Sequence, residues 1–114
     1  MILSDLRRLL VAAGLALTMS LAQPMPRMTT AEPTNGKIGD VIAVTGENLD
    51  KSAVQKIYLT DGKNDYECAV TEQAATAVKI KIPDKAKPGR LSLMVLTAGK
   101  EGRLIEQPVK VTVE

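Results

Sequence analysis

The sequence predicts an all-β antiparallel sandwich, and three observations support this fold class. Short apolar runs with a period of two recur along the chain from residue 38 onward. Gly, Pro, Asn and Asp separate these runs, as expected for the turns that join short strands. After residue 22 no segment shows a convincing helical period, and the Ala-rich stretch 73–77 is too short to stand as a helix.

Six runs place apolar side chains on one face of a strand and polar side chains on the other. This is the pattern of an antiparallel strand that buries one face against a second sheet. The run from Val54 alternates less regularly than the others. The six expected strands are Ile42–Thr45, Val54–Leu59, Tyr66–Val70, Val78–Ile82, Leu91–Val95 and Val109–Val113.

The composition limits both the size of the core and its chemistry. The chain has 114 residues, which suits one domain, and its apolar share of 45% is almost entirely aliphatic. Tyr58 and Tyr66 are its only aromatic residues, and it contains no His, Trp or Phe. Without His the chain lacks the commonest general base and the commonest metal ligand. We therefore expect no catalytic residues, no cofactor and no metal site, and hence no enzyme.

Residues 1–22 have the three parts of a secretory signal peptide. Arg7 and Arg8 precede an apolar run from Leu9 to Leu21, and small residues at Ser20 and Ala22 mark a cleavage point after Ala22. A second candidate cleavage point follows Ala31, and the alternative is a helix packed on the domain. The run is shorter than the roughly 20 residues of a membrane-spanning helix. We expect a secreted, periplasmic or cell-surface protein with no membrane span in its mature form.

The segment 23–32 is expected to be a Pro/Thr-rich linker. Pro24 and Pro26, with Pro33 just beyond, disfavour both helices and central strands. The folded domain is then expected to cover 33–114. Without residues 1–22 the charge is 13 basic minus 12 acidic residues, or +1. This balance gives no electrostatic reason to expect a nucleic acid partner.

Pro33 and Gly36 precede an alternating strand, which leads into a Gly-x-Asn turn closed by Leu49. This run, 33–49, resembles the start of an IPT/TIG domain, a family with an immunoglobulin-like fold, with Leu49 in place of the usual aromatic residue. The later strands follow in the family's order, and one ends at Pro83. A longer gap than usual separates Val95 from Val109.

The physical reasons for these residues stand beside the resemblance. Gly46 allows a sharp turn with positive φ, and Asn48 can bond to its own backbone. Leu49 is expected to fold back over the end of the sandwich. Pro83 stops a strand because it lacks the backbone donor.

The resemblance implies a bacterial, non-catalytic module that binds another extracytoplasmic protein or acts as a structural spacer. The alternative that it implies is a carbohydrate-binding module for extracellular polysaccharide. Neutral sugars are usually bound on aromatic faces, and Tyr58 and Tyr66 alone could provide them. This scarcity favours the first function.

The remaining reactive groups favour structural roles. Cys68 lies in an alternating run and is expected to be a small buried apolar residue, since no His is present to activate its thiol. The segment 61–65 has the composition of a hairpin turn rather than of a calcium loop. Asp40, Glu47 and Asp50 could gather at one end of the sandwich, but solvated surface acids explain them as well.

A basic cluster is the main candidate binding patch. Its residues are Lys79, Lys81, Lys85, Lys87 and Arg90, with Asp84 as the single acid among them. The cluster could bind an acidic partner, such as an anionic glycan or an acidic protein. The alternative is a solvated strand face whose lysines protect a sheet edge against aggregation.

Overall fold

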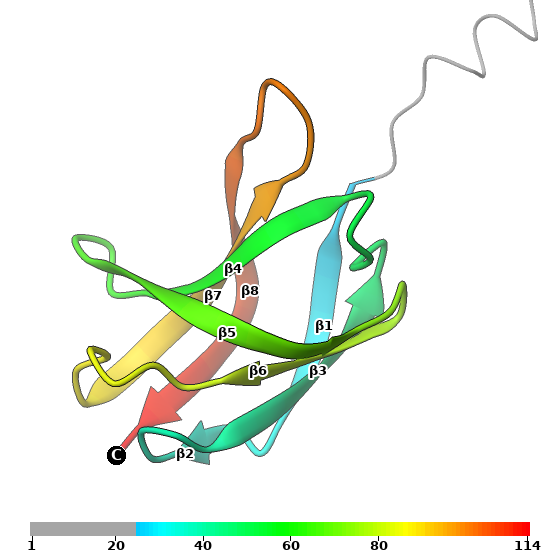
Figure 1. The fold of residues 1–114 in the computed structure, drawn as a ribbon. Coiled ribbons are helices and arrows are strands. Elements are labelled where there is room, and N and C mark those ends of the chain that lie inside the picture. Colours follow the sequence, from blue (N-terminus) through cyan, green and yellow to red (C-terminus); the bar gives the residue numbers. More distant parts are fainter. Residues whose placement is uncertain (1–24) are drawn as a thin grey trace, which may run out of the picture.

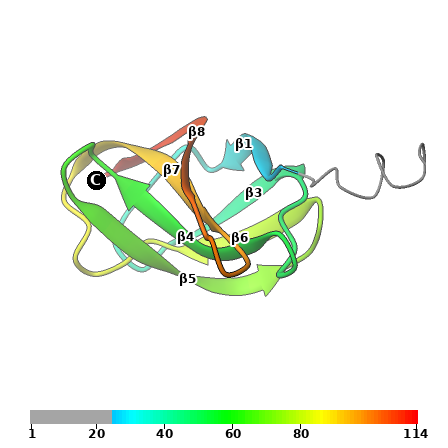
Figure 2. The same cartoon turned by 90° about the horizontal axis from the view of Figure 1, so that it is seen from above.

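The computed structural model describes residues 25–114 and forms a β-sandwich without helices (Figures 1 and 2). The predicted signal peptide, with its cleavage point after Ala22, lies outside the described residues. No helix in the described part of the chain is long and apolar enough to cross a membrane. The eight strands are β1 (Arg27–Glu32), β2 (Asn35–Gly36), β3 (Val41–Glu47), β4 (Val54–Thr60), β5 (Asp65–Gln73), β6 (Ala77–Lys81), β7 (Gly89–Thr97) and β8 (Leu104–Val113).

The strands form two layers that share strand β5. The order is β1-β3-β6-β5-β4-β7-β8-β2. The second half of β5 pairs with β6, and its first half pairs with β4. We call β1, β3, β6 and the second half of β5 the first sheet, and the first half of β5 with β4, β7, β8 and β2 the second sheet. All pairings are antiparallel except that of β2 with β8. The expected all-β, immunoglobulin-like sandwich is confirmed.

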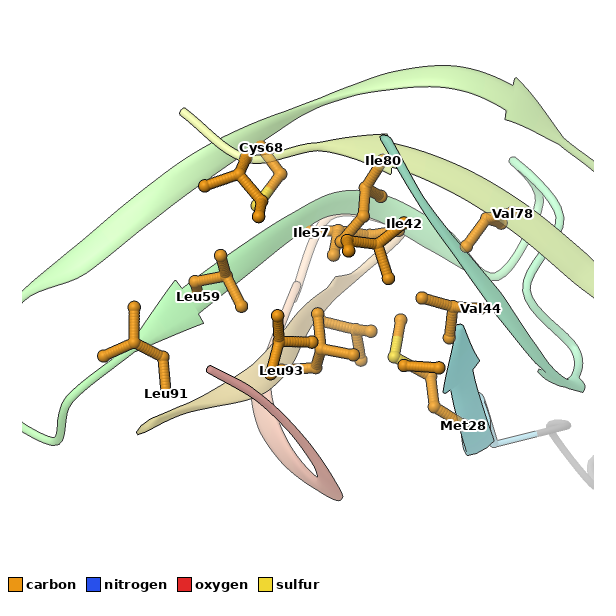
Figure 3. Packing of buried hydrophobic residues seen from close by; sticks show 14 of the residues in the cluster. Met28, Ile42, Val44, Ile57, Leu59, Cys68, Val78, Ile80, Leu91 and Leu93 are labelled. Atoms are coloured by element: carbon orange, nitrogen blue, oxygen red, sulfur yellow. The ribbon is translucent and has the colours of Figure 1, made fainter. Parts of the chain in front are cut away.

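The alternating apolar residues of both sheets meet between the layers. Ile42, Ile80 and Leu93, from β3, β6 and β7, are fully buried and pack in one cluster (Figure 3). Each of the six predicted strands is present at its predicted place. The irregular alternation in the second run corresponds to a bulge between Val54 and Lys56, where β4 changes register against β7.

The predicted linker over residues 23–32 is wrong for residues 27–32, which form β1. This strand pairs with β3, and Met28 and Ala31 are buried in the core. The prolines flank the strand rather than interrupt it, so it keeps its backbone donors. A bulge between Met28 and Thr30 breaks the alternation that would have revealed the strand.

The turn after β3 forms as expected, but two of its residues have other roles. Leu49 is fully buried at the end of the sandwich, and its N–H donates to the carbonyl of Ala75. The positive φ of 56° belongs to Asn48, whose side chain donates to the carbonyl of Met25. Gly46 lies within β3, where any Cβ would overlap the carbonyl oxygen of Arg27. Glycine is therefore needed there because β1 approaches closely, and not for a positive φ.

A side-chain bridge closes the seam between the first and last long strands. The buried side chain of Gln107 on β8 accepts a hydrogen bond of 2.8 Å from the backbone N–H of Met28 on β1. Pro108, the next residue, offers no backbone donor. This hydrogen bond joins the two sheets along the seam between β1 and β8.

Candidate functional site

The outer face of the second sheet carries an apolar platform. Tyr58 on β4 and Met94 on β7 are cross-strand partners. Both point away from the core, because their neighbours Ile57, Leu59 and Leu93 point into it. Met94 is only 8% exposed although it does not belong to the core cluster. Its neighbours on the outer face therefore cover it, and Tyr58 stays half-buried beside it.

Carboxylates stand on both sides of this platform in the same row of the sheet. Glu67 on β5 is the partner of Tyr58, and Glu106 on β8 is the partner of Met94. Both glutamates are exposed. Across four neighbouring strands the row therefore holds a carboxylate, an aromatic ring, a thioether and a second carboxylate.

The next row toward the β7–β8 hairpin extends the apolar surface. Leu96 on β7 faces Leu104 on β8, and Leu104 is 54% exposed. On β4 this row holds Lys56, whose ammonium group lies 3.3 Å from the carboxylate of Glu67. The positive charge of Lys56 on this side of the platform is thus paired with the carboxylate of Glu67 in the same sheet.

The second tyrosine takes no part in the platform. Tyr66 packs against the core, and its hydroxyl is buried without a hydrogen-bond partner. Of the two aromatic residues that the sequence offered for sugar binding, only Tyr58 lies on an outer face.

The predicted basic cluster is divided between several parts of the surface. Lys79 and Lys81 lie on the outer face of β6, as their alternation predicted. The Lys79 ammonium group lies 3.4 Å from the carboxylate of Glu72, its partner on β5. Lys79 therefore has an acidic neighbour within its own sheet.

The other three cluster residues lie beyond β6. Lys85 and Lys87 are exposed in the loop between β6 and β7, and Arg90 stands on β7 in the second sheet. Lys87 is close enough to Asp61 to contribute to the lowered pKa of that carboxyl, after the backbone N–H groups of Asn64 and Lys63. The five residues thus extend from one sheet over a loop to the other sheet, with acids beside them.

Cys68 is a buried core residue. It lies inside β5, and desolvation raises the pKa of its thiol to about 12. At neutral pH the group is a thiol, which is a poor nucleophile. The predicted structural role of this cysteine agrees with its position.

Of the three acidic residues that could have gathered at one end, Asp40 is separated from the other two. Asp40 precedes β3 and Glu47 ends it, so the whole strand lies between them, whereas Asp50 follows Glu47 in the β3–β4 loop. The carboxylate of Asp61 accepts hydrogen bonds from the N–H groups of Lys63 and Asn64, which builds the predicted hairpin turn between β4 and β5. Within residues 25–114 no three His, Cys, Asp or Glu side chains are grouped closely enough to hold a metal ion.

A cleft of about 740 Å³ lies at the end of the sandwich where the described chain begins. Met25, Ala53 and Leu104 give it apolar walls, and Asp50 and Arg103 add charges of opposite sign. The Ser52 hydroxyl bonds to the Asp50 carboxylate and lowers its pKa. The cleft offers no set of groups that converges on one ligand chemistry.

Nearly the whole of this β-sandwich matches one known protein family. A model of the IPT/TIG domain matches residues 26–113, which is most of the chain. The chain belongs to the IPT/TIG domain family. The match begins just before β1 and so includes the strand that the sequence analysis had assigned to the linker. No curated protein sequence matches this IPT/TIG chain significantly.

Several solved structures from Bacteroides species resemble this IPT/TIG chain. A protein of unknown function from Bacteroides thetaiotaomicron is 21% identical over 81% of this chain, with a TM-score of 0.67. An auxiliary nutrient binding protein from Bacteroides ovatus is 21% identical over 81%, with a TM-score of 0.57. SGBP-B of a mixed-linkage glucan utilization locus of Bacteroides ovatus, solved with a mixed-linkage heptasaccharide, is 17% identical over 75%, with a TM-score of 0.51.

These likenesses show the fold alone. The matched part is 22%, 21% and 22% of those chains, so this IPT/TIG chain spans about a fifth of their length.

Proposed function

We propose that this IPT/TIG domain is an exported, non-catalytic module that acts as a structural spacer or as a contact for another extracytoplasmic protein. The observation that carries this proposal is the path of the chain. Near Met25 the described chain enters at the end of the sandwich formed by the β3–β4 loop, and it leaves from β8 at the opposite end (Figure 1).

A path of this kind holds the two ends of the domain apart, so partners that contact opposite ends of the sandwich are separated by its length. Strand β8 pairs from end to end with residues 89–96 of β7, and these seven steps span roughly 23 Å at about 3.3 Å per residue. The side-chain bridge between Gln107 and Met28 and the buried core resist bending along this axis. These features suit a spacer better than a hinge.

The chemistry of the described residues supports a role without catalysis. Cys68 is the only thiol in the chain, and its pKa is raised to about 12 by burial. The chain contains no His to act as a general base. The acidic side chains of the described part form turns, ion pairs with lysines, or solvated surface.

Distance measurements between labels at the two ends test the spacer geometry. We suggest Met25→Cys with Glu114→Cys in a Cys68→Ala background, labelled with a dye pair. We expect a separation of roughly 25–35 Å, since the labels flank the paired length of β7 and β8. A separation below about 20 Å would place both attachment points at one end and contradict the proposal.

Export is tested by sequencing the N-terminus of the protein recovered from outside the cytoplasm. We expect Gln23 as the first residue, because Ser20 and Ala22 provide the small side chains that a signal peptidase needs. Recovery of a chain that starts at Met1 would exclude the signal peptide.

A second candidate function is binding of extracellular carbohydrate. The observation that favours it is the outward position of Tyr58 beside Met94, flanked by Glu67 and Glu106. The similar structures include one solved with a mixed-linkage heptasaccharide and one named a nutrient binding protein, although the likeness to both is of fold. Retention of the domain on immobilised neutral polysaccharide would favour this function over a spacer alone.

A further inference from the structure

We propose that the outer face of the second sheet, centred on Tyr58 and Met94, binds a neutral oligosaccharide across the strands. This inference rests on the second candidate function and names its binding surface and ligand class. The spacer geometry does not depend on it, so the two can fail separately.

The first argument is the composition of the central row. Glu67, Tyr58, Met94 and Glu106 follow one another across β5, β4, β7 and β8. A pyranose ring has an apolar face of C–H groups and an edge of hydroxyls. The half-buried ring of Tyr58 offers an apolar surface for the face, and Met94, only 8% exposed, packs beside the ring and supports it. The two carboxylates accept hydrogen bonds from the hydroxyls at either side.

The second argument is the size of the apolar surface. From β5 to β8 the row covers three inter-strand spacings, or about 14 Å. The apolar side chains that reach the surface are Tyr58, Leu96 and Leu104, in two adjacent rows. A stable protein interface buries about 800 Å² on each partner, and this strip is far smaller. A narrow, extended ligand fits it better than a protein surface does.

The third argument concerns charge. Lys56 pairs with Glu67 at 3.3 Å, and Lys110 lies on the same face of β8 as Glu106. Because both signs stand around the platform, the face attracts neither an anionic nor a cationic polymer. Of the basic cluster, Lys79 and Lys81 on β6 belong to the other sheet, whereas Arg90 lies on the outer face of β7, opposite Thr112 of β8. The mixed signs favour a neutral ligand over a strongly charged polymer.

The Leu104 side chain shows that, within the described residues, the end of this face near the β7–β8 hairpin is open to solvent. It is 54% exposed, and Leu96 beside it is half-buried. Val41 on the outer face of the first sheet is exposed to a similar degree, at 46%, but its strand neighbours carry no aromatic side chain. Val41 is thus a matched apolar control that lies outside the proposed site.

The experiment measures retention of the exported chain in native gels that contain mixed-linkage β-glucan, xylan or mannan, with a sulfated polysaccharide as the anionic comparison. It also measures tyrosine fluorescence during titration with oligosaccharides of each polymer. The chain has no Trp, so the emission of Tyr58 and Tyr66 can be read directly. We expect retention by at least one of these polymers. In Tyr58→Ala we expect the association constant to fall by about tenfold or more, as for a central aromatic contact.

Four control variants locate the site. Tyr58→Phe should keep most of the affinity, because it keeps the ring. Glu106→Gln should lower the affinity, while Val41→Ala should leave it unchanged. Tyr66→Phe should also bind as the original chain does, and the change in its fluorescence should then come from Tyr58 alone.

Each result of this experiment either supports or overturns the proposed binding site. Loss of binding in Tyr58→Ala, with binding kept in Val41→Ala and with an unchanged unfolding midpoint, supports the site. Lack of retention by all three polymers, or binding that survives Tyr58→Ala, overturns it. Retention that is restricted to anionic polysaccharide and lost when Lys79, Lys81 and Lys87 are changed to Glu also overturns it, and assigns binding to the basic cluster instead.

Discussion

The outer faces of β6 and β7 differ although their inner faces are alike. On the inner side both strands bury branched aliphatic residues, such as Ile80 and Leu93. On the outer side β6 presents the exposed lysines 79 and 81, whereas β7 presents Met94, which is almost fully covered. The difference arises from the cross-strand neighbours, because Lys79 faces Ala43 and Glu72 while Met94 faces Tyr58 and Glu106. The position of a side chain on an outer face does not by itself decide whether it is solvated.

The largest expected effect lies on the inner face of β6. Ile80→Ala should lower the free energy of unfolding by roughly 2–5 kcal/mol, since Ile80 is fully buried between the sheets. Ile80→Asp should abolish folding, because it buries a charge without a partner. Lys79→Ala should change the free energy of unfolding by less than about 0.5 kcal/mol, because its ion pair with Glu72 is exposed. Denaturant titrations in which Lys79 matters more than Ile80 would contradict this register.

An intermediate effect is expected on the outer face of β7. Met94→Ala should lower the free energy of unfolding by about 1–2 kcal/mol, less than a core truncation but clearly more than Lys79→Ala. The reason is that the alanine variant loses only the contacts that the Met94 side chain makes with its neighbours on the outer face. Chemical denaturation of both variants side by side measures the difference. Equal values for Met94→Ala and Lys79→Ala would show that the two outer faces are equally solvated.

The pH dependence of stability tests the buried position of Cys68 inside β5. Burial raises the pKa of its thiol from 9.0 to about 12. Above about pH 9 the unfolded chain loses the thiol proton while the folded chain keeps it, so stability falls as pH rises from 9 toward 12. We expect Cys68→Ala to remove part of this fall, as measured by unfolding at pH 8, 9 and 10. Identical pH profiles of the two proteins would show that Cys68 is accessible in the folded state.

The smallest effect on stability is expected for the basic cluster. Reversal of Lys79, Lys81 and Lys87 to Glu should leave the fold intact, since all three side chains are exposed. If the cluster binds an acidic partner, retention on a sulfated polysaccharide column should be lost in this variant and should weaken with salt in the unchanged chain. Equal retention of both proteins at low salt would leave the lysines as a solvated strand face. The predicted protection of a sheet edge is wrong for Lys79 and Lys81, because β6 pairs with β3 on one side and β5 on the other.

Much of the fold could be predicted from the sequence, because a strand that buries one face carries apolar residues at every second position. The runs around Ile42, Ile80 and Val111 show this period, and each is a strand. Strand β1 could not be predicted in this way, because its bulge after Met28 interrupts the alternation and prolines stand on both sides. The reason for glycine at position 46 was also hidden, since it depends on how closely β1 approaches.

The candidate site was less predictable than the fold. Tyr58 could be named from the sequence as an aromatic residue, but its platform depends on cross-strand pairing with Met94. Alternation alone predicts an exposed Met94, and only the three-dimensional register places Tyr58 and Glu106 over it. The basic cluster gave a clear sequence signal, yet the fold distributes its residues over two sheets and a loop.

An NMR titration tests the contrast between the two outer faces most directly. Backbone amide shifts of the exported chain would be followed while a neutral oligosaccharide is added, and in a second sample while a sulfated one is added. The platform account predicts that the neutral ligand shifts the amides around Tyr58, Met94 and Glu106 and leaves those around Lys79 and Lys81 unchanged. Shifts confined to the lysine face of β6, or no shifts with the neutral ligand, would contradict it.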